Sequence, residues 1–218
     1  AHGFFTIDGQ KMSKSIGNVI DPNRLVDDYG SDGARYLVIS QFPFGSDGDI
    51  KADEFDVKYN ADLANGIGNL VSRVLGMTEK YFDGQFPEAE FSADFDLAGF
   101  WQTLDFNYRD LKIYENLQEI MNLVRWCDGY IDQTKPWELA KENEAVLRQV
   151  IYNLLEVIRH LSFAILPYLP ETAEKIWQKL GVEEEKKVSL EKLEDFGRLV
   201  SGHKVTKGEA LFQRKENA

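Results

Sequence analysis

The sequence is poor in residues that form covalent or metal cross-links. Among 218 residues it has one cysteine, Cys127, and three histidines, His2, His160 and His203. A lone thiol cannot close an internal disulfide or build a cysteine zinc knuckle. The histidines are scattered, without a carboxylate or cysteine at ligand spacing, so we predict neither a metal site nor a histidine general base. Within its apolar helical pattern, Cys127 is expected to be a small buried hydrophobe in a reducing, cytoplasmic setting.

Long hydrophobic runs and an excess of positive charge are also missing. The apolar runs are short and interrupted by charge, which excludes a membrane span, and no signal peptide is visible. Hydrophobic residues make up 43% and charged residues 28% of the chain, as in ordinary soluble globular proteins. The formal net charge of −12 argues against nucleic-acid binding, because that affinity comes largely from Lys and Arg. A positive cleft can nevertheless lie on an acidic protein.

One short segment gathers positive charge against this acidic background. In Lys11-Met12-Ser13-Lys14-Ser15, two lysines stand three residues apart among small hydroxyl-bearing residues. Lysine is a compact charge on a long stem, so the segment suits a mobile loop that binds phosphate oxygens. The two serines add hydroxyl donors. The alternative is a solvated surface loop, which the two lysines alone would favour.

The pentapeptide resembles the signature loop of class I aminoacyl-tRNA synthetases, and its surroundings narrow the resemblance to the methionyl-tRNA synthetase family. The matching segments agree in order and spacing, and they are Ala1–Phe5, Tyr29–Tyr36, Pro43–Asp49, Asn60–Asn65, Gly68–Arg73, Pro136–Trp137 and Leu211–Phe212. The resemblance is strongest over residues 1–80. The family's His-Ile-Gly-His-like element does not occur, so we expect a C-terminal fragment that does not catalyse on its own.

The resemblance implies a parent enzyme that activates methionine with ATP and Mg²⁺ and transfers it to tRNA(Met). It implies that residues 11–15 bind the ATP phosphates and that Lys11 and Lys14 are catalytic. It also implies an anticodon-binding site made of Asn69, Arg73, Pro136 and Trp137. The zinc of many family members lies in an insertion that this chain does not contain, so no metal site is expected here.

On spacing alone, the anticodon candidates can also be explained without RNA binding. Asn69 and Arg73 lie four residues apart on one helix face, turned from the apolar stripe, which fits an exposed polar pair. Pro136 fixes the backbone and starts a new helical turn, and a tryptophan such as Trp137 is usually core. The resemblance favours RNA contacts, since Asn reads base edges, Arg binds phosphate or stacks, and Trp stacks on bases.

The apolar pattern predicts a mainly α protein. Asp21 and Pro22 are typical of a helix start, and this helix should stop at Gly30 before a second one runs to about residue 41. Residues 43–49 are turn-rich, and residues 83–95 resemble a loop. Apolar stripes at three- and four-residue steps predict helices over about 53–83, 97–111, 117–131, 146–165 and 171–180, with a short helical turn at Pro136.

We therefore expect a helical-bundle anticodon-binding domain over residues 53–182. A small α/β connecting segment with the lysine loop should precede it over residues 1–52, and a charged, loosely packed tail should follow over residues 183–218. Two alternatives remain open: another class I synthetase, and a non-catalytic helical module that binds tRNA or protein. The upstream sequence of the gene would separate them. The oligomeric state is not predicted.

Overall fold

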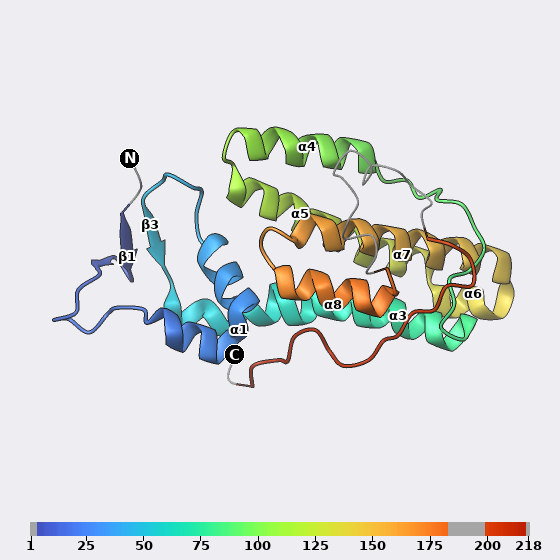
Figure 1. The fold of residues 1–218 in the computed structure, drawn as a ribbon, viewed down its shortest axis with the longest axis horizontal. Coiled ribbons are helices and arrows are strands. Elements are labelled where there is room, and N and C mark those ends of the chain that lie inside the picture. Colours follow the sequence, from blue (N-terminus) through green and yellow to red (C-terminus); the bar gives the residue numbers. More distant parts are fainter. Residues whose placement is uncertain (1–3, 183–198, 217–218) are drawn as a thin grey trace.

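The protein is mainly helical, with a small sheet at one end of a helical bundle (Figure 1). The computed structural model describes residues 4–182 and 199–216. This architecture confirms the predicted fold class. Within these described ranges, no helix is long and apolar enough to cross a membrane.

Helix α1 (Pro22–Ile39) follows the lysine loop and begins as predicted. The Asp21 carboxylate accepts a hydrogen bond from the backbone N–H of Asn23, and Pro22 occupies the first turn. Gly30 interrupts the helix with φ 72° and ψ 169°, a conformation that glycine adopts readily. The predicted stop at Gly30 is therefore confirmed.

The sheet has the order β2-β1-β3, from β1 (Phe5–Ile7), β2 (Gln10–Lys11) and β3 (Gly48–Ile50). Strands β1 and β2 form an antiparallel hairpin, while β1 and β3 are parallel. Strand β3 lies where the sequence predicted only turns. Three residues are too few to show a two-residue alternation, and the strand exists because it pairs with β1.

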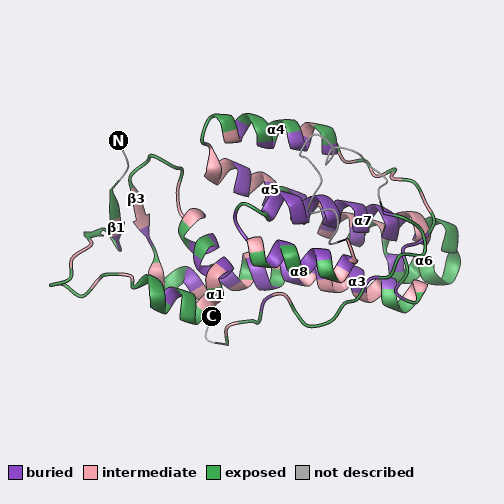
Figure 2. Cartoon of the chain, in the orientation of Figure 1, coloured by how far each residue is buried: buried purple, intermediate pink, exposed green. Residues whose placement is uncertain are grey.

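The bundle is built around α7 (Glu144–Ile165), in which every residue from Val150 to Ile165 is buried (Figure 2). Against it pack α3 (Asn69–Phe82), α5 (Ile113–Thr134) and α8 (Pro170–Leu180), with α6 (Pro136–Glu142) at one end, and α4 (Leu97–Arg109) packs on α5. These helices confirm the predicted ones, although α5 begins earlier than expected. Cys127 is buried, as predicted, and Trp101 and Trp177 are buried as well.

The first predicted long helix is not regular. A short 3₁₀ turn, η1 (Ala52–Glu54), and α2 (Phe55–Lys58) lead into a π-type segment, η2 (Tyr59–Gly68), which continues as α3. Its apolar stripe is buried as predicted, at Phe55, Tyr59, Leu63 and Ile67. The π-type hydrogen bonds span one residue more than α-helical ones. The stripe does not distinguish the two geometries, so the sequence did not predict the wider helix.

Helix α1 is joined to the bundle by a buried carboxylate. One Asp32 oxygen, Oδ2, accepts hydrogen bonds from the backbone N–H (2.6 Å) and hydroxyl (2.7 Å) of Thr172, in the first turn of α8. Asp32 is 5% exposed. It therefore caps a helix that lies far from it in the sequence.

Arg35 of α1 strengthens the same junction. Its Nε donates to the Tyr168 carbonyl at 2.9 Å, and its Nη2 donates to the Pro167 carbonyl at 2.8 Å. Both carbonyls belong to the turn between α7 and α8. The helix that follows the lysine loop is thus tied to the bundle by both a carboxylate and a guanidinium.

The C-terminal segment 199–216 packs along the bundle, which corrects the prediction of a loosely packed tail. Leu199, Val205 and Phe212 are buried, and the Val205 N–H donates to the Gly84 carbonyl at 2.7 Å. In Figure 1 this red segment runs beside the helices back to α1. Its buried residues are far apart in the sequence and follow no helical or strand period. Residues 183–198 of the predicted tail lie outside the described part.

Candidate functional site

The lysine loop leaves the sheet at the end of β2 and reaches one end of the molecule (Figure 1). Lys11 is the last residue of β2 and pairs with Thr6 of β1. Met12 is half-buried against the core, whereas Lys11, Lys14 and Ser15 are exposed. The loop therefore has an anchored start and an exposed tip.

A tight turn forms the tip of this loop. The Ser13 carbonyl accepts hydrogen bonds from the backbone N–H groups of Ile16 and Gly17, both at 3.2 Å. Gly17 has φ 76°, which glycine adopts without strain. The hydroxyls of Ser13 and Ser15 are hydrogen-bonded to each other at 2.8 Å. The two serines thus support the turn as well as offering hydroxyl groups.

Sequence reasoning missed Asn18, which ties the loop together. Its Oδ1 accepts from the backbone N–H of Ser13 at 2.8 Å, and its Nδ2 donates to the backbone carbonyl of Lys11 at 3.2 Å. An asparagine that follows a glycine in a polar loop is a signal for such a side-chain-to-backbone contact.

Asp49 of β3 holds the hairpin that carries the loop. Its Oδ1 accepts from the Thr6 hydroxyl and the Gly9 N–H, each at 2.7 Å, and its Oδ2 lies 2.8 Å from Nζ of Lys51. The hydrogen bonds from Lys51, Gly9 and Thr6, in that order, lower the pKa of Asp49 to about 2. This residue was missed because β3 was missed.

Lys11 and Lys14 differ from Lys51 in what surrounds them. Lys51 is paired with Asp49, and its pKa is raised by that contact. Within residues 4–182 and 199–216, neither Lys11 nor Lys14 forms an ion pair. Their charges therefore remain available to an anionic ligand.

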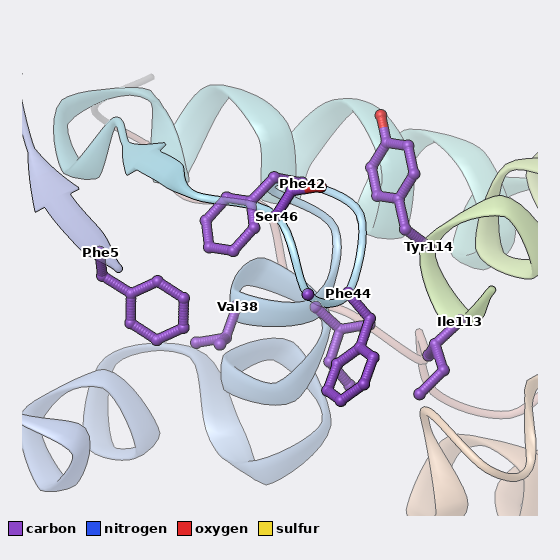
Figure 3. Close-up of a pocket in the computed structure, with 9 residues that line it drawn as sticks. Phe5, Val38, Phe42, Phe44, Ser46, Ile113 and Tyr114 are labelled. Atoms are coloured by element: carbon purple, nitrogen blue, oxygen red, sulfur yellow. The ribbon is translucent and has the colours of Figure 1, made fainter. Parts of the chain in front are cut away.

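An apolar hollow of about 320 Å³ lies between the sheet and the start of α5 (Figure 3). Phe5 of β1, Val38 of α1 and Ile113 of α5 face it, together with Phe42 and Phe44 from the segment between α1 and β3. None of its lining residues is charged. It does not suit a triphosphate or an RNA backbone, so the exposed lysines of the loop are the better candidates for phosphate binding.

Arg73 points from α3 to α5. Its Nη1 lies 3.2 Å from Oδ1 of Asp128, and its Nη2 lies 3.8 Å from Oδ1 of Asp132. Burial raises the pKa of Asp128, and the nearby Arg73 charge opposes that shift. The Arg73 side chain remains 35% exposed, so it is oriented by the two carboxylates without being enclosed.

Asn69 lies one turn earlier on α3 and is half-buried. It lines a polar hollow of about 640 Å³ between the η2–α3 helix and the C-terminal segment, with Ser72 and Phe212 among its neighbours. The predicted orientation away from the core agrees with this position, since Leu70 and Val71 beside it are fully buried. Asn69 and Arg73 nevertheless face different neighbours.

Trp137 lies on α6, at the end of the molecule opposite the lysine loop (Figure 1). Pro136 is buried and opens this helix as predicted, after Lys135 turns the chain with φ 44°. The Trp137 side chain is 43% exposed. The core interpretation of this tryptophan is therefore wrong.

The structure brings Arg73 near the α5–α6 junction, because its partner Asp132 precedes Pro136 by one helical turn. In the described part of the chain, no hydrogen bond or ring contact joins Asn69 or Arg73 to Trp137. The three residues therefore form no preassembled cluster among the described residues. Their joint role in binding stays a prediction.

The statement that no carboxylate stands at ligand spacing from a histidine is wrong for His160. Glu156 lies one turn before His160 on α7, and their side chains are 4.0 Å apart. Burial and the neighbouring Arg159 lower the pKa of His160 to about 2, and its Nδ1 accepts from the Trp101 indole N–H at 2.9 Å. A neutral histidine buried within this hydrogen-bonded group is structural. His2 lies outside the described residues.

Two known protein families match this chain, one over its N-terminal part and one over its C-terminal part. The family described as anticodon-binding domain of tRNA ligase matches residues 97–214. The family described as tRNA synthetases class I (M) matches residues 1–75, which include the lysine loop. The first match covers most of the bundle, and the second covers the sheet, α1 and the start of α3.

Individual relatives are methionine–tRNA ligases. The chain is 43% identical to that of Clostridium acetobutylicum over 98% of its own length and 34% of the relative. It is 39% identical to that of Thermotoga maritima over 98% of its own length and 35% of the relative. It thus spans about a third of the length of these curated relatives.

A solved structure shows the same fold. Mycobacterium tuberculosis methionyl-tRNA synthetase in complex with methionyl-adenylate matches 98% of this chain and 43% of that chain, with a TM-score of 0.88 and 32% identity. The agreement extends over both the sheet and the bundle. The chain therefore belongs to the tRNA ligase anticodon-binding domain family, and the relatives and the solved structure that it resembles are methionyl-tRNA synthetases.

Proposed function

We propose that this chain is the part of a cytoplasmic methionine–tRNA ligase that binds the ATP phosphates at one end and the anticodon of tRNA(Met) at the other. The observation that carries the proposal is the position of the exposed Trp137 on a bundle that matches anticodon-binding domains. The alternatives, another class I synthetase or a non-catalytic module, are disfavoured by the methionine–tRNA ligase relatives. The boundaries after residues 52 and 182 are part of this proposal.

At the loop end, ATP and methionine react in the full-length ligase. A carboxylate oxygen of methionine attacks the α-phosphorus of ATP, pyrophosphate leaves, and the methionyl group then passes to tRNA with release of AMP. Lys14 and Lys11 neutralise the charge on the phosphates, and residues 12, 13 and 15 shape the loop around them. Since no protein nucleophile is required, positioned positive charge is what this loop contributes.

Mg²⁺ would accompany the ATP. Across the described ranges, no group of three or more His, Cys, Asp or Glu side chains could hold a metal ion. Mg²⁺ commonly binds substrate phosphates with one or two carboxylates, so the absence of such a group does not conflict with ATP binding. We propose no resident metal for this chain.

At the bundle end, the indole of Trp137 offers a stacking surface for a base. Arg73 offers a guanidinium to a phosphate or a base, and Asn69 offers an amide that can read a base edge. Pro136 is buried, so its role is to set the direction of Trp137. The net charge of −12 means that these local groups must outweigh a repulsive protein surface.

Binding of a short RNA to the purified chain tests the anticodon proposal directly. We expect an anticodon stem-loop with the methionine anticodon to bind more tightly than the same stem with an altered anticodon. The preference should persist as salt is raised, although both affinities should fall. Equal affinity for the two stem-loops would contradict anticodon recognition by this chain.

The relatives imply a further expectation for catalysis. The chain spans about a third of the length of these methionine–tRNA ligases. We therefore expect the chain alone to show no pyrophosphate exchange with methionine and ATP above background. Clear turnover by the chain alone would contradict the proposal that methionine activation needs the rest of the ligase.

A further inference from the structure

Asn18 is the polar side chain that closes the lysine loop. Its amide oxygen accepts from the Ser13 N–H at 2.8 Å, and its amide nitrogen donates to the Lys11 carbonyl at 3.2 Å. One side chain therefore binds the backbone at both the start and the middle of the loop. We propose that Asn18 is a positioning residue that sets Lys11 and Lys14 for binding the ATP phosphates. This inference rests on the proposed function of the loop.

The geometry explains how one amide can orient two lysines. Lys11 is held on one side by its pairing with Thr6 in the sheet, and on the other by the hydrogen bond from Asn18 to its carbonyl. Ser13 is held through its N–H by Asn18, while its carbonyl closes the turn with Ile16 and Gly17. The residues between these ties are constrained, so Lys14 is presented at the exposed tip.

The loop has few other means of keeping this shape. Residues 14–17 are exposed, and no buried apolar side chain lies among them. Hydrogen bonds from Asn18 and the tight turn therefore define the backbone from which the lysines extend. Preorganised charge contributes to a reaction because it need not be rearranged as charge develops on the substrate. Loss of the amide should therefore reduce the rate of the step that uses both lysines.

Substitutions at this position separate the two hydrogen bonds. Alanine removes both. Aspartate can still accept from the Ser13 N–H, but it cannot donate to the Lys11 carbonyl, and it places a negative charge beside the phosphate-binding lysines. A role in positioning phosphate therefore predicts that aspartate is more harmful than alanine, above all for ATP. A purely structural role would favour aspartate, since it retains one hydrogen bond.

The experiment uses the full-length ligase and measures pyrophosphate exchange with ATP and methionine varied separately. For Asn18→Ala we expect kcat to fall about tenfold, since two neutral hydrogen bonds are lost, with the KM for methionine unchanged. For Asn18→Asp we expect a larger fall and a raised KM for ATP. Asn23→Ala is the matched control, because the exposed Asn23 uses only its backbone N–H at the helix cap. Melting temperatures should be unchanged in all three variants.

Lys14→Ala, measured in parallel, separates a failure of the role proposed for Asn18 from a failure of the function proposed for the lysine loop. If Lys14→Ala loses activity while both Asn18 variants match the wild type, the role of Asn18 is overturned and the function of the loop stands. If Lys14→Ala is also fully active, the proposed function of the loop fails and the inference fails with it. A lowered melting temperature for Asn18→Ala, with Asn18→Asp closer to wild type in rate, would show a structural role and overturn the inference.

Discussion

The lysine loop and helix α7 are opposites within one chain. The loop is exposed and kept in shape by a few hydrogen bonds from Asn18 and Ser13. Helix α7 is buried along every residue from 150 to 165 and forms the centre of the bundle. Burial of apolar surface fixes the bundle, whereas local polar contacts fix the loop. Stability and function should therefore respond to different substitutions.

The largest effect on stability is expected inside α7. Leu154 is fully buried, so Leu154→Ala should leave a cavity and lower the free energy of unfolding by about 2–5 kcal/mol. Lys14→Ala at the exposed loop should change it by less than about 0.5 kcal/mol. Chemical denaturation of the two variants checks this contrast. Equal losses of stability would show that the loop is part of the cooperative core.

Lys14→Ala, which should barely affect stability, should have a large effect on catalysis. In the full-length ligase, Lys14→Ala should lower the rate of methionine activation by about a hundredfold, on the order of 3 kcal/mol, because it removes a preorganised charge. The affinity for methionine should remain nearly unchanged. Lys141→Ala, which removes an exposed lysine on α6, is the control. An unaltered rate with weaker methionine binding would refute the role given to Lys14.

A third substitution tests the junction between the two regions. Asp32→Ala removes the acceptor of the Thr172 N–H and hydroxyl, so the free energy of unfolding should fall by about 1–3 kcal/mol. Asp27→Ala is the matched control, since Asp27 is exposed on the same helix. Denaturation curves for the two variants should differ clearly. Identical curves would mean that α1 is not held to α8 by this carboxylate.

A smaller, local effect is expected from pH at the base of the loop. The folded-state pKa of Asp49 is lowered to about 2, whereas an unperturbed aspartate titrates near 3.9. The hydrogen bonds of Asp49 therefore contribute stability above about pH 4 and lose it as the pH falls toward 2. An NMR titration of the Asp49 carboxylate and the Gly9 amide checks this. A midpoint near 3.9 would show that the hairpin does not hold the ionised carboxylate.

The sequence predicted the bundle better than the loop, and the reason is physical. Each long helix repeats an apolar stripe over many residues, so stripes such as the one through Leu154 and Ile158 are visible without a structure. Strand β3 has three residues, and the packed segment 199–216 buries widely separated residues, so neither offers a period. Asp32 was missed because its partner Thr172 is far away in the chain.

The candidate site was predictable only in part. The resemblance identified the lysine loop and Trp137, and the exposure of Trp137 agrees with a role outside the core. Asn18 and Asp49 act through backbone contacts whose partners are known only once the hairpin is built. The carboxylates that orient Arg73 lie on another helix, so its environment could not be predicted from spacing along α3.

The central claim is that the bundle end recognises an anticodon through Trp137. The most direct measurement is the affinity of the chain for stem-loops with matched and altered anticodons, for wild type, Trp137→Ala and the control Phe106→Ala. Phe106 is an exposed aromatic residue on α4. Thermal unfolding is recorded for each protein, so that a loss of folding is not mistaken for a loss of binding.

Base–aromatic stacking contributes about 1–3 kcal/mol, so Trp137→Ala should weaken binding of the matched stem-loop about tenfold or more. It should also reduce discrimination between the stem-loops, with a nearly unchanged melting temperature. Phe106→Ala should bind as the wild type does. Retained discrimination in Trp137→Ala, or a large drop in its melting temperature with discrimination intact in the folded protein, would contradict the account.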